Sequence, residues 1–173
     1  MAENREGRPS LVESQYRTPD ERRARGKALR QAVPRRGHGE WEPPENRHDP
    51  IELLSASNEG RMPELVPIRF GRMLQSPFAF YRGAAALMAA DLAFTPQSGL
   101  RVQVCGDAHL MNFGGFATPE RNVVFDINDF DETMPGPWEW DLKRLVTSVA
   151  IAGRHIALSE SDVARTAIAT VRA

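Results

Sequence analysis

The chain has 173 residues, of which 41% are hydrophobic and 26% charged, and its formal net charge is −1 at pH 7. This is the composition of an ordinary globular protein of one domain or part of a larger one, and it lacks the excess of Lys and Arg typical of dedicated nucleic-acid binders. One cysteine excludes an internal disulfide, and without an apolar leader or a membrane-length apolar run we expect a cytoplasmic protein with neither nucleic-acid nor membrane partners.

Residues 1–48 are polar and rich in Arg, Glu and Pro, so we expect a largely flexible N-terminal arm that adds little to a core. Thr18-Pro-Asp-Glu21 is a capping box with Pro at the first helical position, which predicts one polar helix ending before Pro34. Asp49-Pro-Ile-Glu52 repeats this start signal and predicts a short helix from Pro50 to about Asn58. The globular part, residues 49–173, begins here.

A longer apolar helix is predicted next. Ser76-Pro77 is its start signal, and residues 77–92 are apolar almost all round, which favours a single helix buried in the core. Arg82 and Asp91 are its polar exceptions.

Two runs then alternate like strands, Arg101–Cys105 and Asn122–Asn128, with a turn at 118–121 before the second. We interpret them as a β-hairpin. Apolar residues at helical spacing predict an amphipathic helix over 138–156, and Ser159 starts another helix that still runs at the end of the chain. We therefore expect a piece of a longer natural protein.

Polar side chains gather at the ends of these two runs. Asp107, His109 and Asn112 follow the first run within one turn, and Asp129 comes just after the second. Pairing the second run with residues near Asn112 would bring its amide and the Asp129 carboxylate to the same side. Mg²⁺ needs only one or two such protein oxygens when a nucleotide supplies phosphate oxygens. We predict a Mg²⁺ site there, with Asp107 free to act as a general base and Gly106 allowing the strained turn.

The order of these residues resembles a known family pattern. Gly106-Asp107-x-His109-x-x-Asn112, then Asp129-Phe-Asp131, then Trp140-Asp-Leu142 is similar to the aminoglycoside phosphotransferase and choline kinase branch of the protein-kinase-like fold. The resemblance implies a catalytic Asp107, a loop-supporting His109, metal-binding Asn112 and Asp129, and a buried Asp141 that braces the catalytic loop. It also implies Mg²⁺ and ATP as cofactors and an acceptor that the pattern does not identify.

Several sequence segments resemble even more closely the bacterial domain-of-unknown-function 2252 proteins, which are grouped with kinase-like folds. The matching segments, within roughly residues 20–173, are Arg69-Phe-Gly-Arg-Met73, Pro77-Phe-Ala-Phe-Tyr-Arg-Gly83, Cys-Gly-Asp-Ala-His and Asn-Asp-Phe-Asp-Glu-Thr. The implied fold is α+β: a mostly helical catalytic-lobe fragment of a protein-kinase-like phosphotransferase, truncated at its C-terminus, with a β-hairpin carrying the catalytic and metal loops.

The sequence departs from the phosphotransferases at two points. Cys105 stands where they have His, and no glycine-rich loop or strand lysine precedes the catalytic loop. In the closer family these elements lie downstream, so the chain alone could be inactive. Arg69, Arg72 and Arg82 are the candidate cations for phosphates, and we assign Arg72 and Arg82 to ATP.

Alternatives remain open at this point. Arg72 and Arg82 could instead pair with Asp91 or Asp141, and Asp126 competes with Asp129 for the metal. A metal-dependent phosphoesterase would use the Asp-x-His pair as ligands but needs more histidines than the chain offers downstream. A catalytically inactive kinase-like binding module is the non-enzyme alternative.

Overall fold

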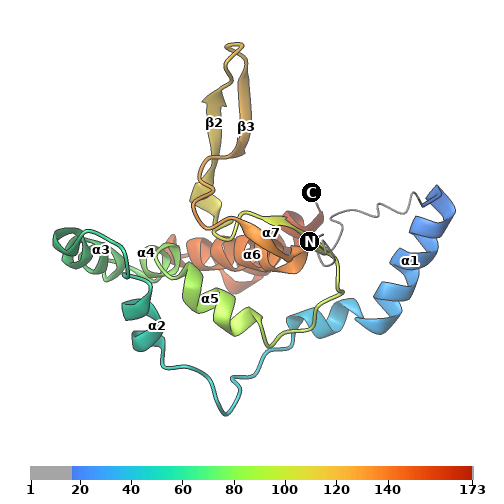
Figure 1. Ribbon diagram of the computed structural model, residues 1–173, viewed down its shortest axis with the longest axis horizontal. Helices are drawn as coiled ribbons and strands as arrows, with labels where there is room; N and C mark the ends of the chain where they lie inside the picture. The colour runs from blue at the N-terminus through green and yellow to red at the C-terminus, as the bar shows by residue number, and fades with distance from the viewer. Residues whose placement is uncertain (1–16, 173) are drawn as a thin grey trace, which may run out of the picture.

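The computed structural model describes residues 17–172, where helices predominate and four short strands form two separate antiparallel sheets (Figure 1). The helices are α1 (Pro19–Ala32), α2 (Pro50–Ala56), α3 (Val66–Met73), α4 (Pro77–Arg82), α5 (Ala85–Leu92), α6 (Trp138–His155) and α7 (Glu160–Arg172), with short 3-10 turns at Arg35–Gly39, Pro63–Leu65 and Leu110–Asn112. The predicted α+β class, mostly helical, is confirmed.

The first two helices begin where their capping signals predict. In α1 the Thr18 backbone N–H donates to the Glu21 carboxylate at 2.7 Å, and the Glu21 N–H donates back to the Thr18 hydroxyl at 3.3 Å. Asp49 caps α2, which ends at Ala56, two residues before the predicted end. Of the predicted flexible arm, residues 1–16 lie outside the described residues. Within the remainder, α1 buries no side chain.

The predicted single helix over 77–92 is wrong, because the chain breaks between α4 and α5 at Gly83. A Cβ at Gly83 would lie 2.6 Å from the Met73 side chain, and the Gly83 carbonyl accepts a hydrogen bond from Arg69 at 2.7 Å. These contacts turn the chain and place Ala84 against Leu54 in a small core cluster. The predicted burial is also only partial, since no side chain of α4 is fully buried.

Strand pairing differs from the predicted hairpin. Residues 101–104 form β1 (Arg101–Val104), but β1 pairs with β4 (Met134–Pro137). Residues 123–127 form β3 (Val123–Ile127), which pairs with β2 (Phe113–Ala117) around the predicted turn. The partners were missed because β2 contains two glycines and β4 two prolines, residues that are depleted in strands and tolerated mainly at sheet edges.

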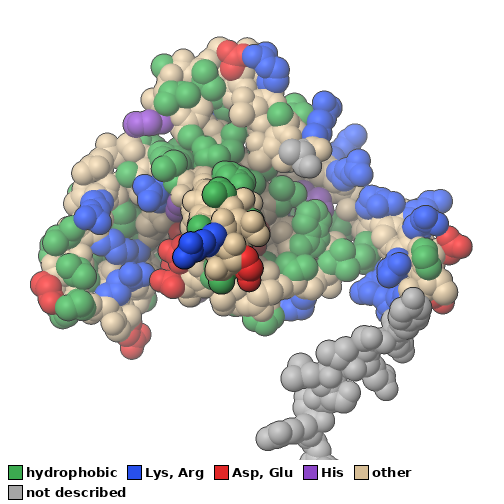
Figure 2. Space-filling view, turned by 90° about the horizontal axis from the view of Figure 1, so that it is seen from above, with side chains coloured by type: hydrophobic (Ala, Val, Ile, Leu, Met, Phe, Trp, Pro, Cys, Tyr) green, Lys and Arg blue, Asp and Glu red, His purple; other side chains and the backbone are tan. Residues whose placement is uncertain are grey.

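The β2–β3 hairpin projects away from the helices (Figure 1). Hydrophobic side chains show on it when the molecule is seen from above (Figure 2). Phe125 is 75% exposed, and Val123 and Phe116 are also exposed. The hairpin therefore contributes little to the core, and its base, next to Asn112 and Asp129, is the part that contacts the rest of the molecule.

The predicted helices over 138–156 and from Ser159 are confirmed as α6 and α7, which pack against each other. Their contact includes Val163 against Gly153, where a Cβ would be 3.1 Å from the Val163 methyl. Helix α6 also contacts β1, α4 and the turn at Leu110–Asn112, and it lies at the centre of the molecule below the β2–β3 hairpin (Figure 1). None of the helices within residues 17–172 combines the length and apolar character needed to cross a membrane.

Candidate functional site

Asp141, in the first turn of α6, holds the backbone of the loop that carries Asp107. Its Oδ2 accepts a hydrogen bond from the Cys105 N–H at 2.7 Å, and its Oδ1 accepts one from the Gly106 N–H at 3.0 Å. Gly106 has φ +83°, and a Cβ there would lie 2.3 Å from the Glu132 carbonyl oxygen. Only glycine fits this turn without displacing backbone. The loop is therefore clamped between α6 and the segment around Glu132.

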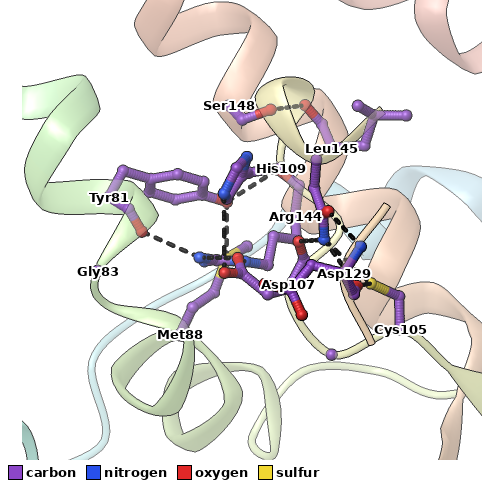
Figure 3. A network of polar contacts seen from close by, with 12 residues as sticks. Tyr81, Gly83, Met88, Cys105, Asp107, His109, Asp129, Arg144, Leu145 and Ser148 are labelled. Atoms are coloured by element: carbon purple, nitrogen blue, oxygen red, sulfur yellow. Dashed lines mark hydrogen bonds and ion pairs between the residues drawn. The ribbon is translucent and has the colours of Figure 1, made fainter. Parts of the chain in front are cut away.

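Arg144, one turn further along α6, binds the Asp107 side chain. Its Nε lies 2.6 Å and its Nη2 2.5 Å from Oδ1 of Asp107, and only 2% of the Arg144 side chain is exposed. Figure 3 shows Arg144 between Tyr81 and Asp107. Arg144 was not among the site residues predicted from the sequence. Its signal was its position three residues after Asp141, which places both side chains on one helix face.

Ser148 adds a third contact from the same face of α6. Its hydroxyl accepts a hydrogen bond from the Leu110 N–H at 2.8 Å, and it is fully buried. Asp141, Arg144 and Ser148 thus occupy positions i, i+3 and i+7 of one helix and bind successive parts of one loop. A rigid helix, and not a flexible loop, determines where Asp107 lies.

His109 packs beside Asp107 as a neutral side chain. Its Nε2 is 3.7 Å from Oδ2 of Asp107, too far for a hydrogen bond, and it is 7% exposed. Burial lowers the pKa of His109, the negative charge of Asp107 opposes this, and the positive charges of Arg144 and Arg82 add to the lowering. Because the pKa falls below its ordinary value, the imidazole is uncharged at pH 7.

Asn112 joins the loop that carries Asp107 to the loop that carries Asp129, the two loops predicted to converge. Its Nδ2 donates to the backbone carbonyls of Asp107 and Asp129, each at 3.0 Å, and its Oδ1 accepts from the Asp129 N–H at 2.9 Å. The hairpin makes this possible, because Phe113 pairs with Ile127 and aligns the residues on either side. The predicted meeting of Asn112 with Asp129 is found, with the amide turned towards the backbone.

Several carboxylates lie close together on the loops that carry Asp107 and Asp129. Asp129 is exposed, and its Oδ1 accepts a hydrogen bond from the Asp131 N–H at 3.1 Å. Partial burial raises the pKa of Glu132, and the charges of Asp107, Asp129 and Asp131 raise it further. Across residues 17–172, no three His, Cys, Asp or Glu side chains converge closely enough to hold a metal by themselves.

The two arginines assigned to ATP are exposed. Within residues 17–172 neither Arg72 nor Arg82 forms an ion pair. Their alternative partners are used elsewhere, since Asp91 binds Arg47 at 2.6 Å and Asp141 binds loop backbone. Arg82 lies near enough to His109 to lower its pKa, so the structure brings Arg82 to the site; it shows no such link for Arg72.

Comparison with known proteins identifies the family. The chain belongs to a bacterial family described as "Uncharacterized protein conserved in bacteria (DUF2252)", which matches residues 61–173. This range runs from just before α3 through α7 and contains every site residue described above. No curated protein and no solved structure matches the chain.

Proposed function

We propose that this member of the DUF2252 family carries the catalytic and metal loops of an ATP- and Mg²⁺-dependent phosphotransferase of the protein-kinase-like type, acting in the cytoplasm. The observation that carries the proposal is the junction at Asn112. One buried amide is hydrogen bonded to the backbone of both Asp107 and Asp129, while Asp141 braces the turn before Asp107. These residues occur in the order of the phosphotransferase motifs, which supports the assignment.

The donor atoms suit a hard cation. Asp129 offers an exposed carboxylate, and the Oδ1 of Asn112 has a second lone pair beyond its bond to the Asp129 N–H. Mg²⁺ uses such oxygens together with phosphate oxygens and water. Asn112 and Asp129 would hold the ion, which when bound neutralises charge on the β- and γ-phosphates. Burial, and then the charges of Asp107, Asp129 and Asp131, raise the pKa of Glu132, and the mutual repulsion of these carboxylates also favours a cation here.

Asp107 is the proposed general base. The acceptor's hydroxyl oxygen attacks the γ-phosphorus, its proton passes to the Asp107 carboxylate, and the bond to the β–γ bridging oxygen breaks to release ADP. A neutral His109 beside Asp107 packs the loop without adding a second positive charge to that of Arg144. Arg82, exposed beside the site, is the proposed phosphate-binding cation, with Arg72 as a second.

The test measures ADP release from Mg·ATP by the longest natural form of the protein, with water and a panel of alcohols as acceptors. Asp107→Asn is compared with Asp162→Asn, which changes a partly exposed carboxylate in the first turn of α7, outside the site. We expect Asp107→Asn to lower the rate by at least about 10²-fold with nucleotide affinity unchanged, since general-base contributions are typically of this size. Retained activity in Asp107→Asn would remove Asp107 from this role.

A further inference from the structure

We infer that Arg144 is the positioning residue that leaves Oδ2 of Asp107 as the single proton-accepting atom of the site. The inference rests on the proposed function and adds to it the identity of the base atom and of the residue that selects it.

The two oxygens of Asp107 have different surroundings. Oδ1 receives both Nε and Nη2 of Arg144, at 2.6 and 2.5 Å. Oδ2 receives no hydrogen bond from any residue in the range 17–172, and Nε2 of His109 lies 3.7 Å from it, beyond hydrogen-bonding distance. The Asp107 side chain keeps 17% of its surface exposed. An acceptor hydroxyl can therefore donate only to Oδ2 without displacing Arg144.

The Arg144 guanidinium also contacts Tyr81 and Met88. Its Nη2 donates to the Tyr81 carbonyl at 3.0 Å, its guanidinium carbon lies 4.6 Å from the centroid of the Tyr81 ring, and its Nη1 is 3.6 Å from the Met88 sulfur. The Tyr81 hydroxyl in turn donates to the Arg144 carbonyl at 2.9 Å. Burial raises the pKa of Tyr81 to about 12, so this hydroxyl stays protonated and keeps donating. Helices α4 and α6 thus fix the guanidinium before any ligand binds.

A purely stabilising role is a weak explanation for this pair. Removing two charges from water costs about as much as their attraction returns, so a buried pair adds little to stability compared with apolar residues of the same volume. Two nitrogens of a buried guanidinium within 2.6 Å of one carboxylate oxygen hold that oxygen in place, so the second oxygen of Asp107 is the one left to face the acceptor. Fixed orientation of a base is what proton transfer at a reacting centre requires.

The kinetic test compares Arg144→Lys with Arg154→Lys. Both substitutions lie on α6, but Arg154 pairs with Glu160 on the exposed surface. With Mg·ATP as substrate and water as acceptor, we expect Arg144→Lys to lower kcat by about 10²-fold with the KM for Mg·ATP within about threefold, because small misplacements of catalytic groups cost about this much. Arg154→Lys should match the wild type. Equal kcat in Arg144→Lys and wild type would overturn the inference.

A second measurement works without turnover. Three-bond scalar couplings on labelled protein report the χ1 rotamer of Asp107, the torsion that keeps Oδ1 of its carboxylate against the Arg144 guanidinium. We expect one rotamer in the wild type and in Arg154→Lys, and rotamer averaging in Arg144→Lys and in Tyr81→Leu, which removes the ring and hydroxyl beside Arg144. A wild type that turns over no ATP contradicts the proposed function only. A single unchanged Asp107 rotamer in a folded Arg144→Lys variant contradicts the role of Arg144, whether or not the wild type is active.

Discussion

Oδ1 of Asp141 accepts a hydrogen bond from the Gly106 N–H at 3.0 Å, so a side chain of α6 holds the turn that presents Asp107. Its Oδ2 does the same for the Cys105 N–H. Both bonds are short-range and directional, and both end on one carboxylate. The loop therefore depends on α6 as much as on its own sequence.

Asp141→Asn is expected to destabilise the protein by about 1–3 kcal/mol, because the amide can accept only one of the two N–H groups and leaves the other unpaired. Urea unfolding followed by circular dichroism measures this. The matched control is Asp126→Asn, an exposed residue of β3, which should change stability by less than about 0.5 kcal/mol. Equal effects of the two substitutions would contradict the bracing role.

Gly106→Ala is expected to cost more stability than Gly99→Ala. Both glycines have positive φ, +83° and +80°, so both substitutions carry similar backbone strain of about 1–3 kcal/mol. Only at Gly106 does the new Cβ meet backbone, the Glu132 carbonyl oxygen at 2.3 Å, while at Gly99 no atom lies within 4 Å. Thermal unfolding of the two variants isolates this steric contribution. Identical losses would show that the loops around Gly106 and Glu132 are not in contact.

The neutral state of His109 predicts a pH dependence of stability. Its pKa is lowered from 6.5 in the folded protein, so the unfolded chain binds a proton more readily. The stability that His109 contributes is therefore present above pH 6.5 and lost as the pH falls below it. Urea unfolding at pH 7.5 and pH 5.0 should show a larger loss for the wild type than for His109→Asn. A loss of the same size in both proteins would mean that His109 is not buried in its neutral form.

Arg47 is expected to fasten the segment before α2 to α5. Its Nε and Nη2 bind the two oxygens of Asp91 at 2.6 and 2.8 Å in a partly buried pair. Arg47→Met should lower the free energy of unfolding measurably, since both Asp91 oxygens are bound and such bidentate pairs are stronger than single contacts between exposed side chains. Arg23→Met breaks the exposed pair with Asp20 and should cost nothing measurable. Similar values for both variants in urea titrations would exclude this anchor.

Local signals in the sequence predict the helix starts well. Thr18, Asp49 and Ser76 each accept the backbone hydrogen bond expected of a capping residue, because a cap depends on only three or four neighbouring residues. The break at Gly83 was missed because its cause is a contact with Met73, ten residues away. The pairing of β1 with β4 was also not predicted, because the two strands lie far apart in the sequence and β4 contains two prolines.

In the candidate site, too, some contacts could be predicted from the sequence and others could not. The meeting of Asn112 with Asp129 was predictable, because the residues flank strands that pair in register. Arg144 was not predicted, because its position three residues after Asp141 indicates a shared helix face but does not show that its guanidinium is buried against Asp107. The contacts of Asp141 came from the family resemblance, and the structure shows them as hydrogen bonds to Cys105 and Gly106.

The most direct test of the central claim is a calorimetric titration of the longest natural form of the protein with ATP, with and without Mg²⁺. Asp129→Ala removes the proposed metal ligand, and Asp126→Ala is the matched control on the neighbouring strand. We predict ATP binding that requires Mg²⁺, is lost in Asp129→Ala and persists in Asp126→Ala. Absence of binding in the wild type, or Mg²⁺-dependent binding that survives in Asp129→Ala, would contradict the account.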